Sequence, residues 1–219
     1  IALESESETT IQIEEDTIEE VKSSIIGLFD PQENNFNLNM WSRSDGEDVI
    51  KIVNRISKLS LSKFSEDLLF QVLFTNSYPP KENLSSEEFL KVKIDWLIKK
   101  NRIKDLENFL KSNPEVGQNS KAIKFLINEH LSSANIKSAC EKVDFIDKKL
   151  QNPYLDKFII YCLINNGQRD EAQLVLELLR ERGFKDKFFD DKINFLLGLT
   201  KETSQKILDN NLLNFYFSH

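Results

Sequence analysis

The sequence predicts an all-α protein, an α-solenoid of stacked helix–turn–helix hairpins, and three observations point to it. Apolar residues recur every 33 residues with helical periodicity. The 219 residues include only six Gly and five Pro, which favours helices joined by short turns. Strand-like alternation of apolar and polar residues is confined to Thr10–Ile13.

The 33-residue repeat consists of four apolar columns. Their members are Ile94, Ile127 and Ile160; Ile98, Leu131 and Ile164; Leu106, Ala139 and Ala172; and Leu110, Val143 and Leu176. The first two columns lie four residues apart, as do the last two, so each pair falls on one helical face. The polar break between the pairs holds Asn101, Ala134 or Gly167 at the same register. A period in the low thirties with two helices per unit is typical of hairpins that bury their faces against their neighbours.

The composition of the chain argues against two kinds of partner, nucleic acid and a membrane that the chain would span. The net charge of −7 argues against nucleic acid, because phosphate contacts require clustered Lys and Arg. The lysine-rich stretches are interrupted by acidic residues, which indicates solvated helix surface. No apolar run approaches the roughly twenty residues that span a bilayer, so we expect no membrane span in this chain.

We divide the chain into three parts. Residues 1–15, rich in Glu, Ser and Thr, are expected to form a flexible acidic leader. Residues 16–40 are expected to hold a helix that carries Ile18, Val21, Ile25 and Ile26 and ends near Gly27, followed by an irregular connection. Residues 41–219 form the helical repeat domain, with the regular repeats at about 86–184.

Capping residues and prolines place the helices of this domain. Its first pair is irregular, with one helix capped by Ser44 or Asp45 and a second stopped by Pro79 and Pro80. The predicted helices after Ser85 or Ser86 are 89–98, 103–110, 122–131, 136–150, 153–164, 171–182 and 188–197, and one more begins within 203–208. The apolar segment 212–217 is expected to pack on the last repeat or to continue into further sequence.

The third hairpin carries a family likeness. Residues 158–183, FIIYCLINNGQRDEAQLVLELLRERG, resemble a tetratricopeptide (TPR) repeat. Gly167 stands where that family has its inter-helix glycine, and Ala172 where it has the small residue that lets the helices approach. The likeness covers about 86–184 and departs from the family where Ile94, Ile127 and Ile160 replace a small residue. It implies a TPR-like stack.

The whole chain carries a second likeness. The order FDPQENNFNLNMW, a Tyr-Pro-Pro stop, CLINNG and GFKDKFFDDKINFLLG resembles helical alphaproteobacterial proteins that have no established activity. Many of those have the character of exported proteins, so the resemblance implies a periplasmic or otherwise exported location. The alternative is the cytoplasm.

Cys140 and Cys162 are the only cysteines. They are equidistant from a turn centred on residues 151–153, so in an antiparallel pair they lie at the same height. Helices packed at about 8–10 Å bring such residues into disulfide range. The alternative is that both are small buried hydrophobic residues. A disulfide would point to an oxidising compartment.

The sequence predicts no catalytic residues, no metal site and no cofactor. It carries no phosphate-binding loop, dinucleotide fingerprint, nucleophile elbow or zinc-ligand spacing. We interpret His130 as a hydrogen-bonded inter-helix residue rather than a catalyst, and Trp96 as core rather than part of a groove with Trp41. The acidic residues Glu181, Asp186, Asp190 and Asp191 are interpreted as solvated surface rather than a cation site.

These observations favour a non-enzymatic scaffold that binds a protein or peptide on the concave face of its hairpin stack. The first helices of the hairpins are expected to expose Lys91, Asp95, Lys124, Asn128, Lys157 and Tyr161 there. The second hypothesis is an exported structural protein or spacer of a bacterial envelope. The third is a helical enzyme.

Overall fold

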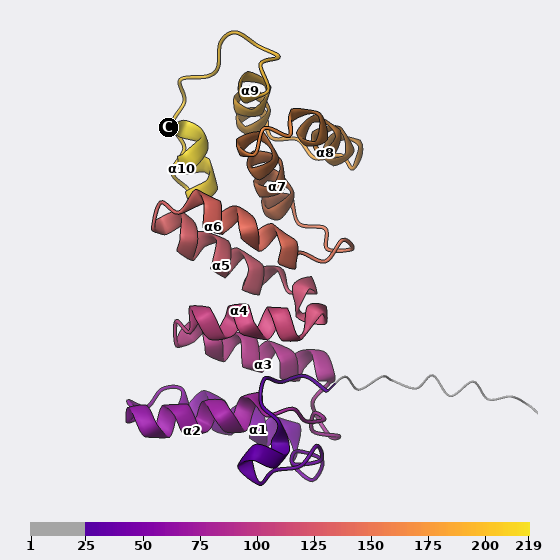
Figure 1. Cartoon of the computed structure of the whole chain (residues 1–219), viewed down its shortest axis with the longest axis vertical. Coiled ribbons are helices and arrows are strands. Elements are labelled where there is room, and N and C mark those ends of the chain that lie inside the picture. Colours follow the sequence, from indigo (N-terminus) through magenta and orange to yellow (C-terminus); the bar gives the residue numbers. More distant parts are fainter. Residues whose placement is uncertain (1–24) are drawn as a thin grey trace, which may run out of the picture.

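The computed structural model describes residues 25–219, and this part of the chain is all-helical (Figure 1). It contains ten α-helices, three 3₁₀ turns and two isolated β-bridges, with no strand among the described residues. The all-α prediction is therefore confirmed. The acidic leader and most of the helix expected before Gly27 lie outside the described residues, and Ile25 and Ile26 are not helical.

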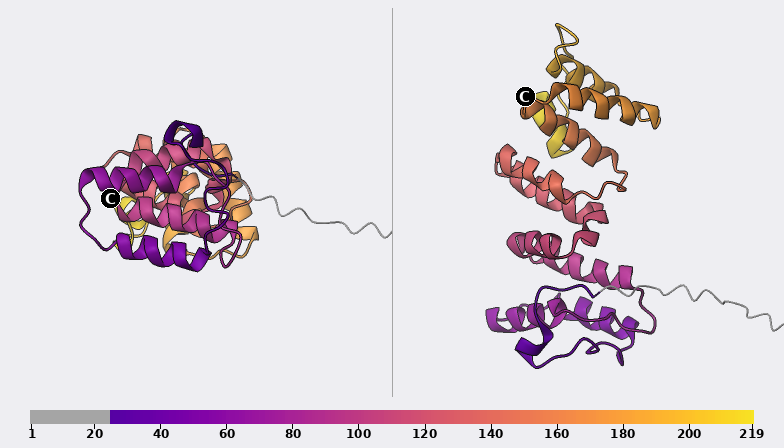
Figure 2. Two further views of the ribbon diagram at one scale, coloured as in Figure 1. Left: turned by 90° about the horizontal axis from the view of Figure 1, so that it is seen from below. Right: turned by 45° about the vertical axis from the view of Figure 1, so that its right-hand side comes forward.

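Most helices follow one another as pairs along the longest axis of the molecule (Figures 1 and 2). The α-helices are α1 Gly46–Ile56, α2 Lys63–Phe74, α3 Ser86–Lys99, α4 Ile103–Ser112, α5 Ser120–Ser132, α6 Ile136–Glu141, α7 Pro153–Asn165, α8 Arg169–Glu181, α9 Lys187–Leu196 and α10 Leu212–Ser218. The 3₁₀ turns are η1 Pro31–Asn34, η2 Pro114–Gln118 and η3 Lys142–Phe145. The pairs α3–α4, α5–α6 and α7–α8 each pack closely and coincide with the regular repeats.

Capping residues explain where the helices begin. The Asp45 side chain accepts from the backbone N–H of Asp48 at the start of α1. Ser85 and Glu88 form a reciprocal capping box at the start of α3. Asn119 and Asn152 cap α5 and α7, each accepting from two backbone N–H groups of the first turn, and are themselves 33 residues apart. The repeat thus extends to helix starts as well as to the core.

The turn inside each regular pair requires a left-handed residue. Asn101, Ala134 and Gly167, which share one register of the repeat, have φ values of 50°, 54° and 77°. Each closes its helix through the backbone, and the N–H of Asn101, for example, donates to the carbonyl of Ile98. Glycine adopts this conformation without a steric cost from Cβ, and asparagine visits it more readily than other residues with a Cβ, so Ala134 is the strained member.

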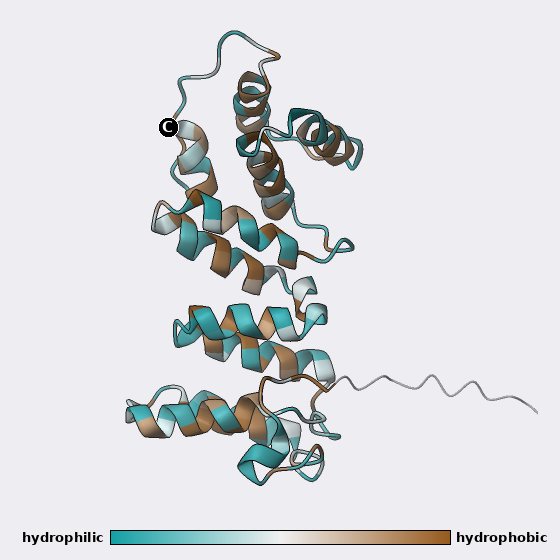
Figure 3. Cartoon of the chain, in the orientation of Figure 1, coloured by the Kyte–Doolittle hydropathy of each residue, from teal (hydrophilic) through white to brown (hydrophobic). Residues whose placement is uncertain are grey.

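The four apolar columns form the core. Nine of their twelve members are buried and the other three, Ile98, Val143 and Ile164, are half-buried against it. Figure 3 shows teal and brown residues mixed along the helices, as expected for amphipathic helices that bury one face. The repeat therefore describes real inter-helix packing.

Two predicted helices differ in the structure. The helix expected over 136–150 ends at Glu141 and tightens into η3, because the chain then turns at Asp147, whose side chain accepts from the N–H of Lys149. The helix expected to begin within 203–208 is absent, because Lys192 Nζ donates to the carbonyl of Ser204 and holds this segment extended. The last helix begins instead at Leu212, capped by Asn211.

The apolar C-terminal segment folds back on the molecule. Helix α10 packs against α9, which follows the last repeat, and against α5. The Tyr216 hydroxyl donates to the carbonyl of Leu131 at 2.7 Å. The ring of Phe217 meets Tyr161 and Phe189 edge-on, with centroids 5.3 Å apart in both cases.

The segment before η1 is tied to the regular pairs. Lys93 Nζ donates to the carbonyl of Ile26, and the Asn113 side chain donates to the carbonyl of Gly27 and accepts from its N–H. Gly27 admits no Cβ, because one would lie 2.6 Å from the backbone nitrogen of Asn76. Ile26 is thereby fixed beside the first turns of α3.

Candidate functional site

The predicted binding face begins on α3 with Lys91 and Asp95. Lys91 is exposed, whereas Asp95 is half-buried. The Asp95 carboxylate lies 2.6 Å from Nζ of Lys121, at the start of α5. This ion pair joins the first helices of two successive pairs and leaves Lys91 as the exposed charge of the α3 portion.

The next portion of the face is tied to α7. The Tyr154 hydroxyl donates to the side-chain oxygen of Asn128, and Nζ of Lys124 lies 5.5 Å from the centroid of the Tyr154 ring. Burial raises the pKa of Tyr154 to about 12, so its hydroxyl stays a donor at neutral pH. Lys124 and Asn128 are consequently half-buried.

The prediction of exposure is wrong for Lys157, which is only 8% exposed. Its Nζ lies 3.1 Å from Asp186 and between the rings of Phe184 and Phe189. Tyr161 is half-buried beneath Phe217. The chain after α8 returns over Lys157, and Tyr161 shares a pocket with α9 and the C-terminal segment. Lys91, at α3, stays exposed, so we focus on the portion of the face at α3 and the start of α5.

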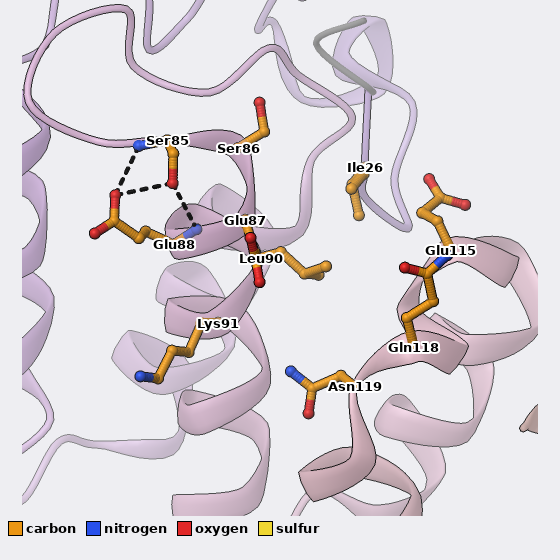
Figure 4. A pocket seen from close by; sticks show the side chains of 10 residues that line it. All are labelled: Ile26, Ser85, Ser86, Glu87, Glu88, Leu90, Lys91, Glu115, Gln118 and Asn119. Atoms are coloured by element: carbon orange, nitrogen blue, oxygen red, sulfur yellow. Dashed lines mark hydrogen bonds between the residues drawn. The ribbon is translucent and has the colours of Figure 1, made fainter. Parts of the chain in front are cut away.

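A cavity of about 760 Å³ opens at that portion. It lies between the first turns of α3 on one side and η2 with the start of α5 on the other (Figure 4). Leu90 points from α3 into the space between these walls, and Ile26 lies at its edge. Its lining residues are Ile26, Ser85, Ser86, Glu87, Glu88, Leu90, Lys91, Glu115, Gln118 and Asn119.

The charge of this cavity is mainly acidic. Glu88 is engaged in the capping box, and the hydrogen bonds from the backbone and side chain of Ser85 hold its pKa below the ordinary value. Glu87 and Glu115 make no salt bridge with any described residue. Two carboxylates are therefore available to a cationic group. Gln118 Nε2 already donates to Asp147 and Asn119 Oδ1 already caps α5, so these two residues add the amide oxygen of Gln118 and the amide nitrogen of Asn119.

A second hollow of about 340 Å³ lies on the other side of α3, against α1. Ile50, Val53 and Trp96 contribute apolar surface, and Glu88 and Lys91 line this hollow as well as the larger cavity. The exposed face of α3 thus separates two adjoining concave surfaces. Together they can accept an extended ligand.

No family model, curated protein or solved structure matches this chain.

The remaining candidate residues have structural partners. His130 Nε2 and Lys142 Nζ lie 3.0 Å and 3.1 Å from the same oxygen of Glu107, which ties α5 and η3 to α4. Burial by itself raises the pKa of Glu107, but the hydrogen bonds from His130 and Lys142 outweigh it and hold the pKa low. Asp186 caps α9 and pairs with Lys157, and Asp190 pairs with Arg180 at 2.6 Å. Trp96 is core and Trp41 is half-buried.

Residues 25–219 contain no group of three His, Cys, Asp or Glu side chains that could hold a metal ion. Within the same range, no helix is both long and apolar enough to cross a membrane. The cavity between α3 and α5 combines carboxylates, amide groups and an apolar surface. This combination is suited to binding another molecule.

Cys140 and Cys162 are joined by a disulfide, with their Cα atoms 5.5 Å apart. The bond connects the end of α6 to the middle of α7, two helices of successive pairs. The two cysteines therefore meet across the turn at 151–153, as their equal distance from it predicts, although α6 itself is shorter than expected.

Of the residues that line the cavity between α3 and α5, only Lys91 belongs to the binding face predicted from the sequence, and most of the others were missed. They come from helix caps and a 3₁₀ turn, outside the apolar columns that reveal the repeat. One signal could have found part of this region, because the caps Asn119 and Asn152 recur at the same 33-residue spacing. The gap between α3 and α5 itself depends on η2, which has no counterpart in the periodic pattern.

Proposed function

We propose that this protein is a non-enzymatic scaffold, a TPR-like α-solenoid that binds an extended protein or peptide segment across α3 and α5. The observation that carries the proposal is the 760 Å³ cavity between those helices, together with the adjoining hollow on α3. Helical repeat stacks use such concave surfaces between successive units to bind partners.

The chemistry of the cavity favours a segment with Lys or Arg side chains. A cationic group would meet Glu87 and Glu115, while Leu90 would contact the aliphatic part of the same side chain. Gln118 Oε1 would accept from the peptide backbone and Asn119 Nδ2 would donate to it. Lys91, on the rim, would favour a neighbouring acidic residue in the ligand.

Selection from a random peptide library, followed by anisotropy measurements on the selected peptides, tests this proposal. The double variant Glu87→Lys with Glu115→Lys should weaken binding at least about tenfold, or about 1.4 kcal/mol, because it reverses both available carboxylates. Glu177→Lys, on the exposed side of α8, is the matched control and should bind like the wild type.

Two results would overturn the proposal. One is a folded protein that enriches no peptide, and the other is binding that the double variant leaves unchanged. Ser85 and Glu88 are left intact in both variants so that the cap of α3 is preserved.

The disulfide favours a second reading of the same scaffold, in which it is an exported structural protein or spacer of a bacterial envelope. Disulfides form and persist in oxidising compartments such as the periplasm. Cys140 and Cys162 brace two successive helix pairs, as a rigid spacer requires. Fractionation of the source cells distinguishes this reading, because a cytoplasmic protein with two free thiols would exclude it.

A further inference from the structure

The first helix pair exposes a concentration of large apolar side chains. Ile52, Leu59, Phe64 and Leu68 all belong to α1, α2 or the loop between them, and each is at least half exposed. Phe64 is the most exposed of them at 78%. A concentration of large exposed apolar side chains on one helix pair indicates an interaction surface.

A groove of about 420 Å³ lies on the same pair, between α1 and α2. In the view from below, the two helices lie apart at the end of the molecule (Figure 2). Eight of the eleven lining residues are apolar: Trp41, Val49, Ile52, Val53, Ile56, Leu69, Val72 and Leu73; the other three are Ser44, Asp45 and Asp48. The end of the helix stack is therefore apolar where a terminal repeat normally turns a polar face to water.

The exposed phenylalanine and the groove belong to one surface. Phe64, Leu68 and Val72 are four residues apart on α2 and share one helical face, and Val72 lines the groove. One end of this surface therefore protrudes, at Phe64, and the other end is hollow. Such a surface is complementary in shape to a second copy of itself turned by a half rotation.

The charged residues of this helix pair also differ between its two ends. Asp45 and Asp48 line the groove at the start of α1, where Glu47 lies between them in sequence. Lys51 pairs with Glu47 at 3.0 Å and with Asp48 at 3.7 Å, so three carboxylates face one lysine and this end keeps a net negative charge. Lys58 and Lys63 lie at the opposite end, where the loop joins α1 to α2. Hydrogen bonds from the Asn83 side chain and the Asp48 backbone hold the pKa of Asp45 below its ordinary value, so this end stays negative. A half rotation brings the acidic end of one copy against the basic end of the other.

We propose that the α1–α2 face is a two-fold interface between two copies of this chain, in which Phe64 of each copy enters the groove of the other. The contact is isologous, so the same patch is used twice and the assembly closes as a dimer. It covers the apolar end of each helix stack and leaves the cavity between α3 and α5 open. The proposal stands independently of what that cavity binds.

Sedimentation equilibrium of the full chain over a range of concentrations tests the interface. The wild type should have twice the 25.5 kDa mass of one chain. Phe64→Asp should give a monomer, because it places a charge in an apolar groove while its own exposed site leaves the fold intact. Leu174→Asp, on the exposed side of α8 and 58% exposed, is the matched control and should remain a dimer.

A charge exchange tests the orientation. Asp48→Lys and Lys63→Glu should each raise the dimer dissociation constant about tenfold, and the double variant should restore it, because the reversed charges face each other again. A wild type that is monomeric at every concentration would assign this face to a different partner and overturn the proposal. A dimer that Phe64→Asp leaves intact, or a double variant weaker than either single variant, would also overturn it.

Discussion

Lys93 donates a hydrogen bond of 2.6 Å from Nζ to the carbonyl oxygen of Ile26, 67 residues earlier in the chain. The side chain is 1% exposed and lies 4.7 Å from the centroid of the Phe89 ring. No carboxylate of the described residues forms a salt bridge with it, and the neighbouring Ser77, Pro79 and Ser86 are neutral. Burial therefore lowers the pKa of Lys93 to about 7.

Because of this lysine, we expect the free energy of unfolding to rise with pH. Below about pH 7 both the folded and the unfolded chain carry the charge, so the full cost of burying it is present. Between about pH 7 and the unfolded value of 10.5 the folded state loses the proton and the unfolded state keeps it. The free energy of unfolding should then rise by up to about 1.4 kcal/mol per pH unit.

Urea unfolding of the wild type and of Lys93→Met, between about pH 6 and about pH 9.5, measures this effect. The methionine variant lacks the titrating group, so the difference between the two curves isolates Lys93. Parallel curves would contradict the prediction. The absolute stability of the variant is a separate matter, because its Ile26 carbonyl loses the hydrogen bond from Nζ.

Removal of the disulfide should lower the free energy of unfolding. Cys140 and Cys162 are 22 residues apart, and opening a loop of this length costs about 3 kcal/mol on the chain-entropy account. The double variant Cys140→Ser with Cys162→Ser should show this loss in urea unfolding. Addition of a reductant should lower the wild type to the same value and leave the variant unchanged. A reductant effect on the variant would show that another process is being measured.

The left-handed turn residues Ala134 and Gly167 occupy equivalent positions of the repeat, and substitutions there should change stability in opposite directions. Ala134 has φ 54° and Gly167 has φ 77°, and neither turn needs its side chain for packing, since Ala134 is exposed and nothing lies within 4 Å of a Cβ built on Gly167. Ala134→Gly should raise the free energy of unfolding by about 0.5–1 kcal/mol, and Gly167→Ala should lower it by about 1 kcal/mol. Thermal unfolding of both variants measures the difference. The same sign for both would contradict the assignment.

The repeat was predictable because burial follows helical periodicity. Ile94, Ile127 and Ile160 are each fully buried, as their column requires. The equal height of Cys140 and Cys162 on their two helices follows from the number of residues between each cysteine and the turn. This spacing is a local property of the chain. These features depend on spacing alone.

The remaining features depend on contacts between distant segments. Lys157 occupies the same register as Lys91 but is buried, because Asp186 and Phe184 from the chain after α8 cover it. Lys93, a charged side chain on α3, is enclosed by the segment at Ile26, 67 residues earlier in the chain. The periodic pattern contains no information on where such non-repeating segments return.

Glu107 supplies the last prediction, because one of its oxygens accepts from both His130 and Lys142. Lys142 is buried, so Glu107→Gln leaves a buried cation without its counter-charge. The cost should be about 2 kcal/mol, between the values for exposed and fully buried pairs, since Glu107 is half-buried. Urea unfolding at neutral pH measures it, with the exposed Glu177→Gln on α8 as the matched control.

The wild type and Glu107→Gln should also differ in how their stability depends on pH. The pKa of Glu107 is below its ordinary value of 4.5, so its stabilising effect is complete above the unfolded pKa and is lost as the pH falls through the lower, folded value. The wild type should therefore lose stability more steeply than Glu107→Gln as the medium is acidified below about pH 4.5, and their difference should shrink. A difference that stays constant into that acidic range would mean that the carboxylate contributes through its shape and not through its charge.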